Sequence, residues 1–353
     1  MNTKYLISPN FLSFLGIALP LIGLIKNFEE YNNVITIVYL HSLSYLFFCI
    51  GTLIHKNFNY KFFQSNMVNF YNYGKFLIII QIAIIVYIIK EINTIPIFSG
   101  INNDELYERL SVLIPGSLLL LLLLNQLISI FYIHRFIYNK NWKIYLIIFI
   151  QVFSSTLLFK RQILASMLCS FIFIYLYRLK FLRLRNIIII LFYIIIFLIF
   201  FEFINNYRIN KLEELSFSFD NSSIIHYFYM PLNNFDIILR ENNFVTYRHG
   251  FFIEKSIFNE LVNEVFHKGV SFGFIAYCYI YGGYLFLCFI FVIIGFLFQS
   301  LYYSLSINNY ASIVYSFSIW PLLSMHSYTH FFSLYYFYFF ILFVLIFNHL
   351  GKK

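Results

Sequence analysis

Residues 186–204 read NIIIILFYIIIFLIFFEFI, and this stretch decides the fold. A helix of about 20 apolar residues crosses the roughly 30 Å hydrocarbon core of a bilayer. The stretch holds no basic residue, and its one acid, Glu202, lies near its end. The chain then becomes polar from residue 205 to residue 270. This pattern predicts a membrane-spanning helix that opens into a large loop.

The whole chain shares this apolar bias. Of its 353 residues, 61% are hydrophobic and only 11% are charged, whereas about a quarter are charged in a soluble domain. We therefore predict an all-α polytopic membrane protein, a single integral membrane domain over residues 1–353. The first apolar block lacks a small-residue cleavage site, so we expect it to be retained as a span. About ten transmembrane helices are expected from the apolar blocks, near 5–25, 33–54, 74–90, 112–133, 143–159, 162–178, 186–204, 272–298, 309–325 and 331–349.

Two of these spans carry unusual features. The fifth and sixth meet at Lys160-Arg161 with almost no loop, which predicts a tight helical hairpin. The eighth is interrupted by Gly282-Gly283, where we expect a bend. The cysteines lie inside apolar blocks without the spacing of a disulfide framework or a metal site, so we expect small core residues: Cys49, Cys169, Cys278 and Cys288.

The basic residues predict the orientation. Lys and Arg concentrate in cytoplasmic loops, and with a cytoplasmic N-terminus the richest short loop, from Arg178 to Arg185, is cytoplasmic. The acids of the short loops then fall on the outer side. Both termini are thus predicted in the cytoplasm, and 205–270 is predicted as a periplasmic or extracellular loop. The net charge of +9 comes largely from the predicted cytoplasmic segments, which would face the anionic inner leaflet. We therefore expect no nucleic-acid partner.

The outer loop is predicted to contain an amphipathic helix. Within 252–268 (FIEKSIFNELVNEVFHK), apolar residues recur at helical spacing, and Glu264 and Lys268 have the favourable i,i+4 spacing. Such a helix could lie in the membrane interface or cap the helical bundle.

Lys160 and Arg161 are the first candidates for a functional site. Cations between two apolar spans are costly unless an anion joins them. They could snorkel to lipid headgroups, or they could clamp a diphosphate, for which guanidinium geometry is well suited.

Further candidates lie around the predicted outer mouth of the bundle. Arginines and tyrosines there could hold a lipid-linked phosphate, and a neutral histidine near pH 7 is a natural general base. Each could also be a solvated loop residue. They are Tyr207, Arg208, Arg240, Tyr247, Arg248 and His249.

Asp236 and Glu254 are weaker candidates for a base. His41, His326 and His330 lie in or beside spans, where we expect packing or pore-lining roles. The sequence holds no nucleotide-binding loop, no HExxH motif and no Asp-x-Asp pair. We therefore expect no metal and no cofactor, and a donor that arrives already activated.

Several stretches resemble a known family, the Wzy-type oligosaccharide repeat-unit polymerases of O-antigen and capsule synthesis. One is the arginine after a tight outer turn. The others are the entry and the middle of the late outer loop, and the exit from this loop into an aromatic, Gly-Gly span. In order they read LLFKRQILASML (157–168), NNYRIN (205–210), HYFYMPLNNFDIIL (226–239) and KGVSFGFIAYCYIYGGYLF (268–286).

The resemblance implies a metal-independent membrane glycosyltransferase of GT-C-like layout in the bacterial inner membrane, active on its outer face. A growing glycan would leave undecaprenyl diphosphate and join a hydroxyl of the next lipid-linked repeat unit. Membrane lipid is an expected partner, as are a chain-length regulator and a flippase. Arg161, Arg248 and His249 are the predicted catalytic residues. The predicted diphosphate-binding or glycan-binding residues are Lys160, Tyr207, Arg208, Arg240 and Tyr247.

Two alternatives use the same residues or topology. An O-antigen ligase would move a finished glycan onto a lipid core. A transporter (flippase) for lipid-linked oligosaccharides is a non-enzymatic alternative. The absence of repeated halves and of charges in the middle of most spans disfavours this alternative.

The predicted topology can be tested with a reporter. A reporter fused within 213–223 is expected to score as external, because the basic short loops hold the opposite ends of the spans in the cytoplasm. Activity of paired periplasmic and cytoplasmic reporters gives the measurement. A cytoplasmic score at this site would contradict the topology.

Overall fold

The computed structural model describes residues 3–26, 33–58, 71–93, 142–157, 161–179, 181–209, 273–305 and 309–325, with separate positions between 121 and 135 and between 232 and 239. Every regular element in these residues is a helix, as the sequence predicts. In chain order the helices are α1 (Thr3–Leu6), α2 (Pro9–Lys26), α3 (Val34–Phe58), α4 (Tyr71–Ile92), α7 (Trp142–Leu157), α8 (Arg161–Arg178), α9 (Leu184–Ile209), α12 (Phe274–Ser304) and α13 (Asn309–Leu323).

Two stretches of the described helices are long and apolar enough to cross a membrane, by length and composition. They are Val34–Lys56 in α3 and Gly282–Ser304 in α12. Shorter apolar stretches lie in α2, α7, α8, α9 and α13. Helices also occupy the predicted span 74–90 and the described positions of 112–133. The span 331–349 lies outside the described residues, and a full set of ten membrane crossings stays a prediction.

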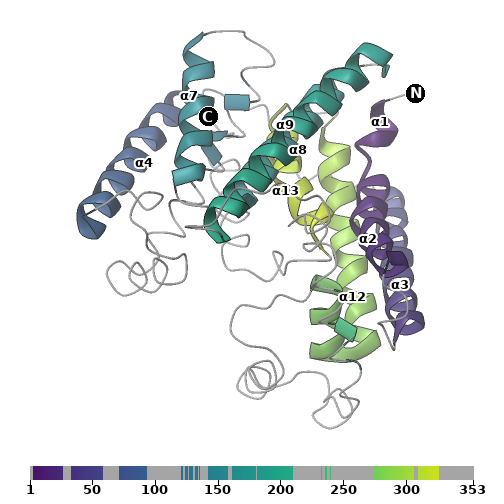
Figure 1. The fold of residues 1–353 in the computed structure, drawn as a ribbon. Helices are drawn as coiled ribbons and strands as arrows, with labels where there is room; N and C mark the ends of the chain where they lie inside the picture. Colours follow the sequence, from purple (N-terminus) through teal and green to yellow (C-terminus); the bar gives the residue numbers. More distant parts are fainter. Residues whose placement is uncertain are drawn as a thin grey trace.

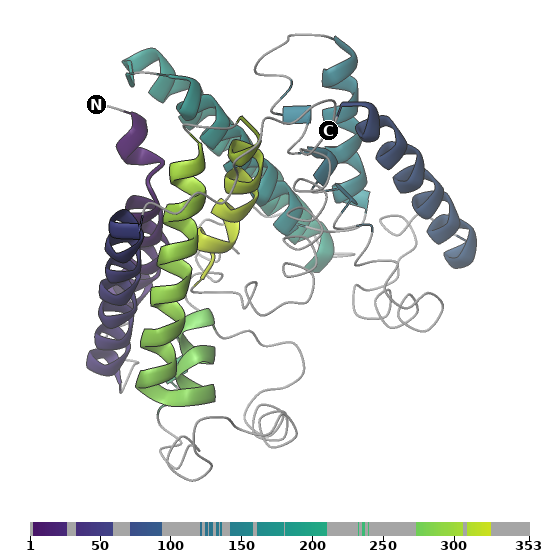
Figure 2. The same ribbon diagram turned by 180° about the vertical axis from the view of Figure 1, so that it is seen from behind.

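Helix α13 lies at the centre of the described helices. It contacts α2, α8 and α12, and α2, α3 and α12 run alongside one another beside it (Figure 1). Seen from behind, α4 and α7 lie on the other side of α8 and α9 from this group (Figure 2). Most described side chains of α13 are buried. Its sequence holds no charged residue, as expected for a helix that other helices surround.

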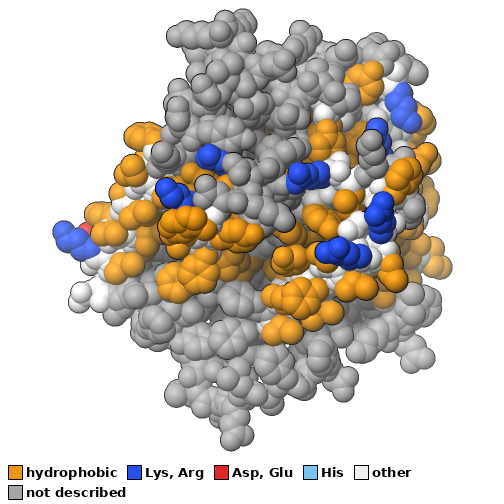
Figure 3. All heavy atoms as spheres, turned by 90° about the horizontal axis from the view of Figure 1, so that it is seen from above, with side chains coloured by type: hydrophobic (Ala, Val, Ile, Leu, Met, Phe, Trp, Pro, Cys, Tyr) orange, Lys and Arg blue, Asp and Glu red, His pale blue; other side chains and the backbone are white. Residues whose placement is uncertain are grey.

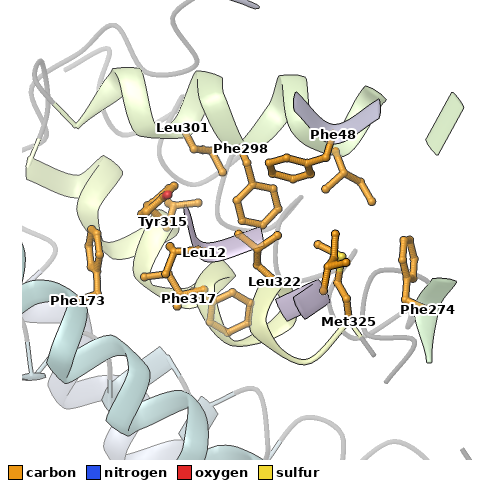
Figure 4. Close-up of a cluster of buried hydrophobic side chains, with 14 of the residues drawn as sticks. Leu12, Phe48, Phe173, Phe274, Phe298, Leu301, Tyr315, Phe317, Leu322 and Met325 are labelled. Atoms are coloured by element: carbon orange, nitrogen blue, oxygen red, sulfur yellow. The ribbon is translucent and has the colours of Figure 1, made fainter. Parts of the chain in front are cut away.

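Helices α12 and α13 supply many of the rings and branched side chains of the core. Phe298 of α12 meets Tyr315 of α13 with 6.3 Å between ring centroids, and it meets Phe48 of α3 at the same distance. Leu12 of α2 and Leu322 of α13 lie beside these rings (Figure 4). Aromatic side chains bury a large apolar area each, and this cluster joins α2, α3, α12 and α13.

Two glycines allow α3 and α12 to approach closely. A Cβ added at Gly51 of α3 would overlap the carbonyl oxygen of Val292, and one added at Gly295 of α12 would overlap the carbonyl oxygen of Phe48. The largest interface among the described helices is the one between α3 and α12. Small residues that bring backbones together are typical of helix pairs in membranes.

A pair of buried glutamines joins α4 to α7. Gln81 and Gln151 exchange two side-chain hydrogen bonds, each 2.8 Å from Nε2 to Oε1. Both side chains are fully buried. An amide within an apolar helix is costly unless it is paired, and each glutamine satisfies the other. The pair fixes how α4 and α7 are turned toward each other.

Other helix faces expose apolar side chains. On α9 the exposed fractions of Leu184, Ile188 and Phe192 are 73%, 58% and 59%. Helices α4 and α7 also expose large apolar residues, among them Ile79 and Phe149. Apolar surface spread over several helices favours an apolar environment, in agreement with the predicted membrane location.

The α3–α12 contact can be tested by adding volume at a glycine. We expect Gly295→Leu to destabilise the protein by about 1–3 kcal/mol or more, because the added side chain has to displace backbone. Thermal unfolding in detergent gives the measurement. Ala83→Leu is the matched control, since Ala83 is exposed on α4. Equal melting temperatures for the two variants would contradict the close contact.

Candidate functional site

Hydroxyl groups tie several helix ends together at the N-terminal end of the molecule. The hydroxyl of Tyr302 donates to the carbonyl of Lys4 (2.9 Å), and that of Tyr315 donates to the carbonyl of Ile7 (2.8 Å). Two further hydroxyl groups, those of Thr3 and Tyr177, donate to the carbonyls of Leu179 and Leu305 respectively. The starts of α1 and α9 and the ends of α8 and α12 therefore lie together.

This N-terminal end is rich in exposed basic residues. Seen from above, where the N-terminus lies in Figure 1, Lys and Arg side chains stand among apolar ones (Figure 3). The residues at these helix ends with exposed basic side chains are Lys4, Arg178, Arg183 and Arg185. All four belong to segments predicted to be cytoplasmic. The described acidic side chains belong to other segments, Glu91 to the last turn of α4 and Asp236 to the loop.

At the opposite end, α12 reverses its direction. Gly283 has φ 65° and ψ −159°, and its neighbour Gly282 is also non-helical. The ring centroids of Phe274 and Phe291 consequently lie 5.7 Å apart, although 17 positions separate them in the sequence. Residues 274–281 thus form a short helix folded back on the remainder of α12.

This geometry refines one prediction. The bend at Gly282-Gly283 is confirmed, but the predicted span 272–298 is misplaced, because the apolar stretch long enough to cross a membrane begins at Gly282 and ends at Ser304. A positive φ turns the chain back on itself, so the preceding apolar residues cannot continue the same crossing. Residues 274–281 are largely buried within the protein, and the backbone N–H of Phe274 donates to the carbonyl of Met325 (2.6 Å). Irregular backbone at membrane depth requires this kind of cover.

A helical face from the long polar loop docks beside this reversal. Leu232, Phe235, Asp236 and Leu239 are helical, and they follow the i, i+3, i+4, i+7 pattern of one helix face. Leu232 and Phe235 are each 1% exposed, and Leu239 packs against the core. The Phe235 ring lies 6.3 Å from that of Tyr279 in the folded-back helix.

The buried face of this loop segment includes a carboxylate. Asp236 is fully buried, and its Oδ1 accepts a 2.7 Å hydrogen bond from the backbone N–H of Asn33. Asn33 comes directly before α3. The first N–H groups of a helix have no partner within the helix and carry partial positive charge. A carboxylate in this position is stabilised by a charge-assisted hydrogen bond.

Helices α8 and α9 form an antiparallel hairpin. The hydroxyl of Tyr175 donates to Oδ1 of Asn186 (3.0 Å), and the rings of Phe171 and Tyr193 lie 4.8 Å apart. Pairing in this order brings the start of α8 to the same end of the hairpin as the end of α9. That end is opposite to the end held by Thr3 and Leu179.

The hairpin places part of the predicted site. Arg161 is the first residue of α8, and Tyr207 and Arg208 lie in the last turn of α9. Their backbones therefore lie at one end of the hairpin, away from the N-terminal end. Their side chains lie outside the described residues, so their roles stay predictions. The same holds for the residues of the site that the structure does not describe, which are Lys160, Arg240, Tyr247, Arg248 and His249.

Of the remaining candidates, His41 is described by the structure and the others are not. Nδ1 of His41 lies 2.8 Å from the carbonyl oxygen of Ile37, and the ring is buried in α3. This is the packing role expected for His41. Glu254, the amphipathic helix 252–268, His326 and His330 lie outside the described residues. Within the described part of the chain, no group of three or more His, Cys, Asp or Glu could hold a metal ion.

Sequence reasoning missed the docked loop helix and the buried glutamine pair. The first had a signal, since Pro231 precedes the apolar pattern and proline is common at the first position of a helix. The second had none, because the pairing of Gln81 with Gln151 depends on how two helices pack. Comparisons with protein families, curated proteins and solved structures find no match to this chain.

The reversal of α12 can be tested at its two glycines. We expect Gly283→Ala to lower stability by about 1–3 kcal/mol, because an L side chain rarely adopts its backbone conformation. Gly282→Ala is the matched control, since the φ of Gly282 is negative. Thermal unfolding in detergent compares the two variants. If Gly282→Ala proved the more damaging, the placement of the turn would be wrong.

Proposed function

We propose that the protein is a polytopic inner-membrane glycosyltransferase that polymerises undecaprenyl-diphosphate-linked repeat units into O-antigen or capsular polysaccharide. One observation carries the proposal, which is the sorting of the helix ends. Four exposed basic residues share one end with the N-terminus, namely Lys4, Arg178, Arg183 and Arg185. The exposed Lys90 lies instead in the last turn of α4, next to Glu91. The backbones of Arg161 and Arg208, the docked loop helix and the reversal of α12 lie away from that end.

This sorting supports a site on one face of a membrane. The basic end would face the cytoplasm, and the exposed apolar faces of α4, α7 and α9 would contact lipid. The opposite end would then open to the periplasm or the exterior. The long polar loop would cover a mouth into which polyprenyl chains enter laterally between helices.

The chemistry rests on the predicted site residues. The hydroxyl oxygen of the acceptor sugar attacks the anomeric carbon of the donor glycan. The bond from that carbon to the diphosphate oxygen breaks, and undecaprenyl diphosphate leaves with the electron pair. The charge that develops there would be stabilised by Arg161 together with Arg208, Arg240 or Arg248. His249 would accept the proton of the hydroxyl group.

Arg161 provides the direct test. We expect Arg161→Ala to lower polymer formation by about 10²-fold or more, because removal of one charge-stabilising donor has effects of this size. Polymer is measured by the chain-length ladder of surface glycan in a host that supplies the repeat unit, alongside protein levels in the membrane. Arg183→Ala is the matched control, as Arg183 is exposed just before α9 at the opposite end. Wild-type chain length in Arg161→Ala would exclude the clamp.

Deletion of the gene separates polymerase from ligase. A host without a polymerase carries surface lipid with single repeat units. Loss of all surface glycan, with glycan accumulating on its lipid carrier, would instead identify a ligase. Accumulation of lipid-linked single units on the cytoplasmic face would identify a transporter.

A further inference from the structure

We propose that Asp236 is a positioning residue that fixes the reactive half of the outer loop to the mouth of the helical bundle. This role rests on the proposed function as far as catalysis is concerned, but the anchoring itself does not. Asp236 is the only acidic side chain that is buried among the described residues. Its burial therefore needs a specific explanation.

The carboxylate of Asp236 has a defined place in the core. Asp236 lies on the same helix face as Leu232 and Phe235, and this face packs into the core. Burying an ionised carboxylate is strongly unfavourable without a partner. The backbone N–H of Asn33 supplies one at 2.7 Å, at the positive end of the α3 dipole. The contact joins residues 203 positions apart in the sequence.

The partner of this carboxylate belongs to a well-packed helix. Helix α3 packs along α12, and near the start of α3 the rings of Tyr39 and Tyr284 lie 6.2 Å apart, so the first turns of α3 lie against α12. The folded-back part of α12 contacts the same loop segment through Tyr279 and Phe235. Asp236 and Phe235 thus connect the loop segment to the start of α3 and to α12, which pack against each other.

The proposed reactive residues of the loop come soon after Asp236 in the sequence. Arg240 lies directly after Leu239, the last residue of the docked face, and Arg248 and His249 belong to the same loop. The anchor sets the point at which this reactive segment leaves the bundle. A misplacement there would move every proposed group of the loop relative to Arg161.

The same geometry argues against a role for Asp236 as a general base. A base has to lie within hydrogen-bond reach of the proton that it accepts. Asp236 is fully buried, and one of its oxygens is engaged by Asn33. An amide oxygen can accept the same hydrogen bond, so asparagine should largely replace aspartate as an anchor but not as a base.

Trypsin digestion of the purified full-length protein in detergent tests the anchor without reference to activity. In Asp236→Ala we expect cleavage after Arg240 to accelerate on the order of tenfold, because a hydrogen bond to a charged group is lost and local opening becomes more frequent. Cleavage after Lys211, distant from Asp236 in the same loop, is the internal control and should not change. Asp236→Asn should remain close to wild type. Unchanged cleavage after Arg240 in Asp236→Ala would overturn the anchor.

Polymer formation then tests the functional consequence. Asp236→Ala should lower it on the order of tenfold or more, and Asp236→Asn should restore most of it. Glu91→Ala, which removes an exposed acid of α4, is the matched control. Loss of polymer in Asp236→Asn with normal trypsin cleavage would identify Asp236 as a proton acceptor and overturn the positioning role. If the wild-type protein forms no polymer in any host, the proposed function fails, while the digestion still decides the anchor.

Discussion

The structure depends on one constraint, that backbone polar groups in apolar surroundings have to find partners inside the protein. Within helices the backbone N–H and C=O groups pair with one another, and the buried hydroxyl groups of Ser44 and Ser318 donate to the carbonyls of Leu40 and Val314. Near helix ends, tyrosine hydroxyl groups donate to backbone carbonyls. These hydrogen bonds hold several helix ends together at the N-terminal end of the bundle. At the other end Asp236 meets the same need for the backbone N–H of Asn33, directly before α3. Backbone groups are therefore satisfied by tyrosine hydroxyl groups at one end of the bundle and by a carboxylate at the other.

The helical class and most helix positions could be predicted from the sequence, because long apolar runs such as 186–204 allow few other structures. The break at Gly282-Gly283 was also predictable, since glycine tolerates conformations that other residues avoid. The extent of the reversal was not, because it depends on whether the first turns of α12 pack against Phe291 or continue outward. The helical positions 232, 235, 236 and 239 were missed because a polar segment with a short apolar face gives a weak periodic signal. The pairing of Gln81 with Gln151 depends on tertiary contacts alone.

For the candidate site, sequence reasoning supplied the residue types and the structure supplies part of their arrangement. Arg161 is the first residue of α8, and Arg208 lies in the last turn of α9. Because α8 and α9 pack antiparallel, the backbones of the two arginines lie at the same end of the hairpin. The role of Asp236 required the structure, because nothing in its sequence neighbourhood indicates Asn33 as its partner. In the proposed site, the buried carboxylate of Asp236 at the start of α3 would hold the loop segment against the helical bundle. It would also set the point after which Arg240, Arg248 and His249 follow in the sequence.

A structure of the full-length protein in lipid nanodiscs with undecaprenyl diphosphate bound tests the central claim most directly. We predict that the diphosphate lies at the start of α8, within hydrogen-bond distance of the Arg161 side chain, at the end of the bundle opposite to Lys4 and Arg178. A diphosphate bound instead among the basic residues of the N-terminal end would contradict the assignment of the site and of its side of the membrane.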